Sequence, residues 1–391
     1  MFRPTPWFAA LAAACAAAPD SVPVPPSDAA PRAACDPATA AKDAAALEAM
    51  AADEAARGEP LAAVRLLLDA AAARPDDVPL LEALVRTAST ERLLPLALLH
   101  LRERPDALGR WFTGRVRYLL AIDRAADRAL AELDAASADF AAAADLEPAW
   151  RDGSEQWIAM CIGAKGNAAF ANGDFAAAEQ WLLEAARLRP DRVREDLGRG
   201  DSVKLGLLRL GDRLMRDFAR TERLFRTAAE YVDDDVDLFN NAAVYARDRG
   251  TQLERDGDAA GARAMFERSY AAYGRALGLA PHDVRLRNDC ALVAIHHLRG
   301  DWDRARQLLL DAIADGERTL REDPPARPRE RLDLDEAIGD CYENLALGWL
   351  QHGDAAAARA AAQASLTHHP GELRAGAQQH LRAAGAKAAG G

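Results

Sequence analysis

The sequence predicts an all-α fold, an α-solenoid in which helix hairpins follow one another along the chain. Helix-breaking residues recur through residues 42–371 at intervals of about 30 to 47 residues, which is the spacing of helical repeats. Alanine makes up about a quarter of the 391 residues and aromatic residues only 6%. This composition favours closely packed helices over β-structure.

The N-terminal segment, residues 1–18, has the pattern of an export signal. One cation, Arg3, precedes about a dozen apolar residues, fewer than the roughly 20 that a membrane-spanning helix needs. Within this run, Leu11-Ala12-Ala13-Ala14-Cys15 resembles a bacterial lipoprotein signal, which would make Cys15 the site of lipidation. A plain signal cleaved after an Ala-x-Ala sequence and an alanine-rich end without a targeting role are the alternatives.

Residues 19–41 are rich in proline, with serine, aspartate and alanine between the prolines. Because proline interrupts regular helices, we expect an extended tether between the signal and the repeats. Signal and tether together predict a protein of the cell envelope, either periplasmic or held at the membrane through Cys15. A cytoplasmic location is the alternative if the N-terminus is not a signal.

Within residues 42–371, several units share one spacing of small and helix-breaking residues. A glycine is followed by alanine after 5 residues, by alanine or serine after 12 and by proline after 17. The glycine allows a turn between two antiparallel helices, the small residues let the helices approach closely, and the proline ends the second helix. The positions are Gly58, Ala63, Ala70 and Pro75; Gly173, Ala178, Ala185 and Pro190; and Gly353, Ala358, Ser365 and Pro370.

This spacing resembles the tetratricopeptide repeat, a helix hairpin of 34 residues. The segments that begin at Gly173-Asp174 and Gly300-Asp301 carry the resemblance best, and Gly166 and Ala346 fall at the small eighth position of their units. The resemblance implies a right-handed α-solenoid of tetratricopeptide-like helix hairpins over residues 42–371, with residues 372–391 as a capping helix and flexible tail. Armadillo and HEAT repeats have a similar period but lack the Gly-Asp signature, and are the minor alternative.

Two units are longer than the family repeat. Gly257 precedes Pro281 by 24 residues and Gly300 precedes Pro324 by the same distance, instead of 17. The additional seven residues are about two helical turns, so the second helix can lengthen without rotating its apolar stripe away from the core.

Motifs of catalysis and of cofactor binding are absent from the sequence. It contains no phosphate-binding loop, Gly-x-Ser-x-Gly elbow, His-Glu-x-x-His helix or Cys-x-x-Cys pair. The net charge of −12 argues against a nucleic-acid partner, because phosphate binding needs a basic face. We therefore expect no enzyme activity, no cofactor and no nucleic-acid partner.

Three further features have simple structural interpretations. Each of the adjacent pairs at positions 296–297 and 368–369 places two histidines about 100° apart on a helix, so neither pair alone can hold a metal ion. Asp235 or Asp237 is expected to cap a helix. Cys161, Cys290 and Cys341 lie in apolar stretches and are expected to be small buried thiols.

Polar residues recur in the first helices of the units. In tetratricopeptide arrays these helices line a concave groove, where asparagine can hold the backbone of an extended peptide. The resemblance places seven side chains in or beside this groove: Asn167, Asn240, Tyr245, Arg247, His296, Asn344 and Trp349. The alternative is that the asparagines bridge or cap helices within the stack.

The groove residues predict a scaffold for protein–protein interaction that binds a peptide or partner domain. A small-ligand or envelope-polymer binding module is the alternative and would present tryptophans on one accessible face. The candidates are Trp111, Trp150, Trp157, Trp181 and Trp349, for which helix packing is the simpler use. An unrecognised enzyme would instead show a deep pocket of carboxylates or histidines with shifted pKa values.

Overall fold

A computed structural model describes residues 37–390 except 74–77, 87–89, 124–125 and 199. The described residues form helices joined by short turns, and their only strand-like contact is an isolated bridge between Gly198 and Asp201. The predicted all-α fold is confirmed. The predicted signal with Cys15, most of the tether and Pro75 lie outside the described residues.

The chain divides into two compact units, residues 1–210 and 211–391, and α10 (Val203–Leu214) contains the division. In the first unit, α2 packs against α3, α6 against α7, and α8 against α9. The helices of this unit are α2 (Pro37–Ala56), α3 (Pro60–Ala73), α4 (Val78–Arg86), α5 (Thr90–Glu103), α6 (Ala107–Asp123), α7 (Ala126–Leu146), α8 (Arg151–Ala171) and α9 (Phe175–Leu188), with short 3-10 turns at Pro148–Trp150 and Pro190–Arg192.

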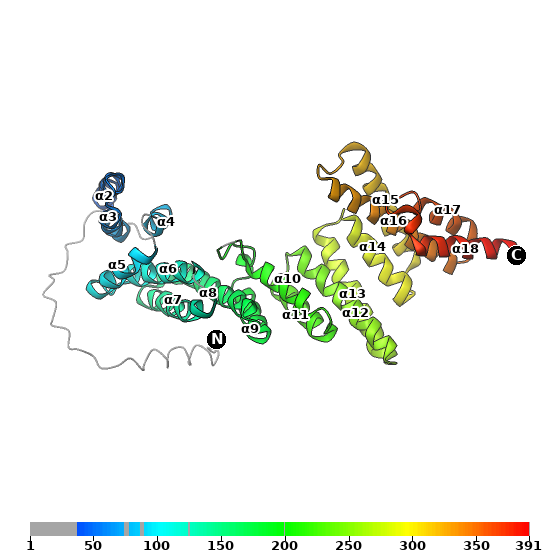
Figure 1. Cartoon of the computed structure of the whole chain (residues 1–391), viewed down its shortest axis with the longest axis horizontal. Coiled ribbons are helices and arrows are strands. Elements are labelled where there is room, and N and C mark those ends of the chain that lie inside the picture. The colour runs from blue at the N-terminus through cyan, green and yellow to red at the C-terminus, as the bar shows by residue number, and fades with distance from the viewer. Residues whose placement is uncertain (1–36, 74–77, 87–89, 124–125, 199, 391) are drawn as a thin grey trace. The chain divides into compact units, whose positions relative to one another are not determined.

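The second unit continues the same pairing, and Figure 1 shows α12 and α13 side by side. Here α14 pairs with α15 and α16 with α17, and α14 also contacts α16, the first helix of the next hairpin. The helices are α11 (Phe218–Tyr231), α12 (Val236–Arg255), α13 (Ala259–Leu279), α14 (Val284–Leu292), the π-helix η3 (Val293–Leu298), α15 (Trp302–Glu322), α16 (Pro328–Gln351), α17 (Ala355–Ser365), the 3-10 turn η4 (Gly371–Leu373) and α18 (Ala375–Gly390).

A glycine or a capping aspartate, often both, builds the turn of several hairpins. The glycine takes a left-handed conformation, with φ between 80° and 86° at Gly58, Gly173, Gly257 and Gly353. In five turns an aspartate then accepts a hydrogen bond from the backbone N–H three residues later, which stabilises the second helix by about 1 kcal/mol. These caps are Asp174, Asp217, Asp258, Asp301 and Asp354.

Small residues lie where the two helices of a hairpin touch. The alanines and the serine of the repeat spacing are at most 1% exposed: Ala63, Ala70, Ala178, Ala185, Ala358 and Ser365. A Cβ atom on Gly166 would lie 2.7 Å from Leu182 Cγ, so glycine at this eighth position allows α8 to approach α9 closely. The predicted lengthening is also confirmed, because α13 and α15 have 21 residues where α9 has 14.

At the ends of the array, helices extend over the boundaries expected from the sequence. The helix α2 begins at Pro37, within the range assigned to the tether. The helix α18 covers most of residues 372–391 and packs against α16 and α17, as a capping helix does. Among the described residues no helix combines the length and apolarity needed to cross a bilayer.

Candidate functional site

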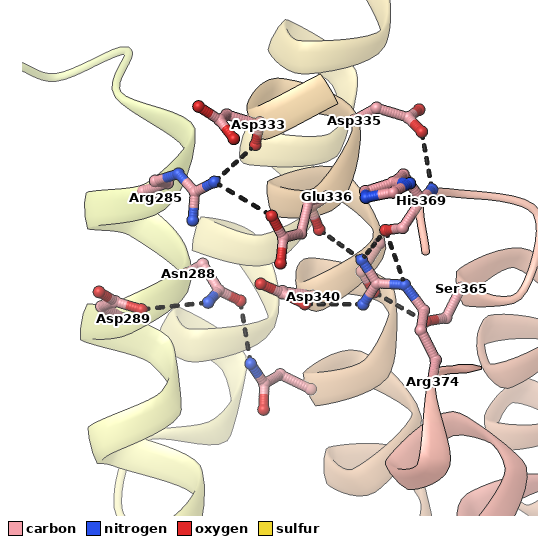
Figure 2. Close-up of polar contacts among 12 residues, drawn as sticks. Arg285, Asn288, Asp289, Asp333, Asp335, Glu336, Asp340, Ser365, His369 and Arg374 are labelled. Carbon is pink, nitrogen blue, oxygen red and sulfur yellow. Dashed lines mark hydrogen bonds and ion pairs between the residues drawn. The ribbon is translucent and has the colours of Figure 1, made fainter. Parts of the chain in front are cut away.

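Two neighbouring first helices of the second unit, α14 and α16, are joined by a chain of side-chain hydrogen bonds. The Asn344 amide nitrogen donates to Asn288 Oδ1 over 2.9 Å, and the Asn288 amide nitrogen donates to Asp289 Oδ1 over 3.2 Å (Figure 2). At the other end, His296 Nε2 lies 3.1 Å from Asn344 Oδ1. We call these four residues, Asp289, Asn288, Asn344 and His296, the amide ladder.

The amide ladder has a single direction of donation. Because the Asn344 nitrogen donates to Asn288, its oxygen accepts, and His296 Nε2 must carry the hydrogen in that bond. Asn288 and Asn344 are only 5% and 8% exposed, whereas His296 is exposed. The two amides therefore bond to each other between the helices, and Nδ1 of the exposed histidine makes no hydrogen bond to the described residues.

Charged side chains surround the amide ladder on the same two helices. Arg285 of α14 donates to the Asp333 carbonyl oxygen over 2.8 Å and lies 3.7 Å from the Glu336 carboxylate of α16 (Figure 2). The side chains of Arg285, Glu336 and Asp340 are 53%, 39% and 40% exposed. We call Arg285, Glu336 and Asp340 the charged rim of the α14–α16 face.

On the other side of α16, Arg374 ties the start of α18 to this face. Its guanidinium, 3% exposed, donates to Asp340 Oδ1 over 2.7 Å and to the Glu336 and His369 carbonyl oxygens over 2.6 Å each (Figure 2). The chain passes this close because Gly339 has no side chain: a Cβ there would lie 2.3 Å from Arg374 Nη2. Arg374 thereby fixes Asp340 at the rim.

The Asp289 end of the ladder lies in a partly buried, charged environment. Burial raises the pKa of the Asp289 carboxyl, while the Arg247 guanidinium and the Asn288 hydrogen bond oppose the shift. Tyr273 is fully buried nearby, and its hydroxyl has no hydrogen-bond partner among the described residues. Burial, followed by the Asp289 charge, raises the pKa of that phenol strongly, so it stays protonated.

Of the seven residues predicted to line the groove, the structure brings together only His296 and Asn344 directly. Tyr245 is buried and stacks on Phe225, with ring centroids 5.4 Å apart. Arg247 pairs with Asp248 beside it, 3.1 Å away. Asn240 is partly buried on α12.

The other two predicted residues take part in packing contacts elsewhere. Asn167, in the first unit, is partly buried and donates to the Ser202 carbonyl oxygen over 3.4 Å. Trp349 packs edge-on against Trp302, with centroids 5.2 Å apart. Asn288 was not assigned to the groove from the sequence, although it lies about two helical turns before His296 and bonds directly to Asn344.

The tryptophans considered for a polymer-binding face do not form one. Trp111 and Trp150 are 4% and 8% exposed and pack on each other within the core of the first unit. Trp157 covers the guanidinium of buried Arg115 at 3.7 Å, and Trp181 covers Lys165 at 4.6 Å. These contacts indicate a role in packing.

The structure also tests the predicted helix cap and the predicted buried cysteines. Asp235 caps α12 by accepting from the backbone of Asp237 and Leu238, which confirms one of the two predicted caps. Cys161, Cys290 and Cys341 are free, buried thiols, as predicted, and burial raises the pKa of Cys161 and Cys290 to about 12. Across residues 37–390, apart from the gaps given above, no three His, Cys, Asp or Glu side chains form a metal-binding group.

The Asp315 carboxylate of α15 is expected to make the stability of the fold depend on pH. Hydrogen bonds from His282 first, and from Arg287 and Arg318, lower the pKa of Asp315 to about 2. Because this value lies below the usual 3.9 of an unfolded aspartate, the stabilisation is complete above about pH 4 and is lost as the pH falls toward 2. We expect Asp315→Asn to lower the free energy of unfolding by roughly 1 kcal/mol at pH 7 and to have a smaller effect at pH 3.

Urea unfolding of both proteins at pH 7 and pH 3 measures this difference. Asp323→Asn is the control, since Asp323 is exposed and makes no ion pair among the described residues. An equal loss for Asp315→Asn at both pH values would show that its carboxylate does not stabilise the fold through charge.

Comparison with known proteins gives the following. No protein-family model matches the chain, and no curated protein is significantly similar in sequence. The C-terminal part of a TPR repeat-containing protein from Cytophaga hutchinsonii is 12% identical, over 77% of this chain and 98% of that chain, with a TM-score of 0.36. The TPR2AB domain of yeast Sti1 in its pHSP90 complex is 14% identical, over 88% and 98%, with a TM-score of 0.23. BtubC from P. vanneervenii is 17% identical, over 62% and 90%, with a TM-score of 0.31. The hairpins described above, rather than these alignments, establish the tetratricopeptide-like fold.

Proposed function

We propose that this protein is a non-catalytic scaffold that binds a peptide or a partner domain on the α14–α16 face. The observation that carries the proposal is the contrast between the two buried amides of the ladder, Asn288 and Asn344, and the more exposed charged rim around them. The ladder holds two first helices at a fixed spacing, and the rim offers both signs of charge to a partner. A fixed surface with exposed charges can select a partner without rearranging.

In this proposal the asparagines and the exposed side chains have different roles. Asn288 and Asn344 bridge helices within the stack, since each is buried and its amide is bonded to the other. Contact with a partner falls to the exposed side chains, His296 through Nδ1 and the rim residues Arg285, Glu336 and Asp340. The role of asparagine is therefore to position the binding face.

We further propose that the chain acts at the cell envelope. The support is the signal pattern of residues 1–18 and the proline-rich tether of residues 19–41. Fractionation of cells that express the full chain or Cys15→Ser tests this: the full chain should be found in the membrane fraction and Cys15→Ser should leave it. A full chain in the cytoplasm would contradict the proposal.

The binding face is tested by photo-crosslinking in cells that express the full chain. A photo-reactive amino acid placed at His296 or Arg285 should give a discrete adduct with a partner. We expect Glu336→Arg, which reverses a charge on the rim, to reduce that adduct roughly tenfold while the thermal stability stays within the range of other surface changes.

The control position is Arg263 on the second helix α13. Its side chain is 68% exposed, and among the described residues it pairs with Glu267 alone. A photo-reactive amino acid there should give no adduct, and Arg263→Glu should leave the adduct from His296 unchanged. Equal adducts from positions 263 and 296, or insensitivity to Glu336→Arg, would move the binding surface away from the α14–α16 face.

A further inference from the structure

The turn between α14 and α15 differs from the other hairpin turns. Gly300 precedes the capping aspartate Asp301, as glycine does elsewhere, but it does not take the left-handed conformation. The last residues of the first helix form the π-helix η3, which has one more residue in each hydrogen-bonded ring than an α-helix. As a result, Arg299 is the residue with positive φ, at 48°. A residue with a Cβ atom is strained there, and such strain concentrates at functional sites.

A pocket of about 450 Å³ opens at this turn, within the size range of small-molecule sites. Its apolar floor is formed by Ala294, Ile295 and Ala305. One wall is aromatic: the rings of Trp302 and His352 stack with centroids 5.0 Å apart and planes 13° apart.

Residues of α16 hold the Trp302 ring of this wall in place. Trp349 packs edge-on against Trp302. Gly348 of α16 leaves room for the indole, since a Cβ at that position would lie 2.0 Å from Trp302 Cζ3. These contacts hold the Trp302 indole in one position at the pocket.

One cation of the pocket, Arg299, has no ion-pair partner in the part of the chain that the structure describes. The Arg299 side chain lines the pocket, and among the described residues it makes no ion pair or side-chain hydrogen bond. The nearby carboxylates are engaged: Asp301 accepts from the Arg304 backbone N–H, and Asp303 pairs with Arg306 over 3.0 Å. A guanidinium fork matches a carboxylate through two parallel hydrogen bonds.

We propose that this pocket binds a small aromatic carboxylate. The aromatic ring would lie against the Trp302–His352 wall over the apolar floor, and the carboxylate would accept from Arg299. Arg299 is itself a lining residue of the pocket, which places the cation beside the bound carboxylate. Ligand binding in this pocket does not require partner binding on the α14–α16 face.

The test uses phenylacetate with the full chain, and NMR titration to measure the Kd. Phenylacetamide, which keeps the ring and lacks the charge, should bind about tenfold more weakly, and acetate should not compete. Arg299→Gln should raise the Kd of phenylacetate about tenfold and leave that of phenylacetamide unchanged. The control Arg255→Gln, at the corresponding turn of α12 and α13, should change neither.

A second variant separates binding from folding. Arg299→Gly removes the charge and accepts the left-handed conformation, so it should weaken phenylacetate binding as Arg299→Gln does while raising Tm by roughly 2–4 °C. Equal affinities for phenylacetate and phenylacetamide, an Arg299→Gln protein with unchanged affinity, or no saturable binding of phenylacetate up to about 10 mM would each overturn the proposal.

Discussion

Replacing Arg374 by alanine is expected to lower the Tm of the second unit by about 6–12 °C, which corresponds to about 3 kcal/mol for a unit of this size. The guanidinium is buried, and three groups accept from it: the Asp340 carboxylate and the carbonyl oxygens of Glu336 and His369. Without it, these acceptors lose their donor in a site that water reaches poorly. Differential scanning calorimetry of the full chain measures the change.

Two further variants show whether the loss of Tm in Arg374→Ala comes from the lost hydrogen-bond geometry or from the lost charge. Arg374→Lys keeps the charge, but a single ammonium group cannot reach three acceptors that the planar fork reaches, so we expect most of the loss to remain. Arg382→Ala removes an exposed arginine from the same helix α18 and should change Tm by less than about 2 °C. A Tm for Arg374→Ala equal to that of Arg382→Ala would mean that these hydrogen bonds do not stabilise α18 against α16.

The hairpins could be predicted because their signals are local. A glycine that turns the chain, an aspartate that caps the next helix and small residues at fixed distances all act within one unit, as Gly173, Asp174 and Ala178 show. The two additional turns of α13 could be predicted for the same reason, since they follow from counting residues between Gly257 and Pro281.

The α14–α16 face could be predicted only in part, because it depends on contacts between units. Asn288 and Asn344 are 56 residues apart, and nothing near either position shows that they bond to each other. The sequence did identify Asn344 and His296 as polar residues of first helices, and it left open whether asparagine bridges helices or binds a partner. For Asn344, the buried hydrogen bond with Asn288 favours the interpretation that the asparagine bridges two helices.

The pocket could not be predicted, because its cause is a change of backbone geometry without a sequence signature. Gly300-Asp301 reads like the turn at Gly173-Asp174, and the sequence predicts a turn that glycine allows in both. In the structure the residue with positive φ is Gly173 in the first turn and Arg299, which follows the π-helix, in the second. The same Gly-Asp pair therefore stands in two different turns.

Two glycines of one hairpin are expected to respond to substitution with opposite signs. A Cβ on Gly250 of α12 would lie 2.7 Å from Phe266 Cε1, and Phe266 is 3% exposed. The ring cannot move away, because His297 stacks on it with centroids 4.0 Å apart. We expect Gly250→Val to lower the free energy of unfolding by about 3 kcal/mol through overpacking. Gly274 of α13 is exposed with no atom near its Cβ position, so Gly274→Ala should raise the free energy of unfolding by about 0.5–1 kcal/mol.

Urea unfolding of the two variants beside the wild type measures both changes, and Gly274→Ala serves as the control for Gly250→Val. Gly250→Val also affects the π-helix. Phe266, which packs against Gly250, is the ring on which His297 of η3 stacks. If Gly250→Val were neutral, Phe266 would be free to move. The stack of His297 on Phe266 would then not hold that ring in place.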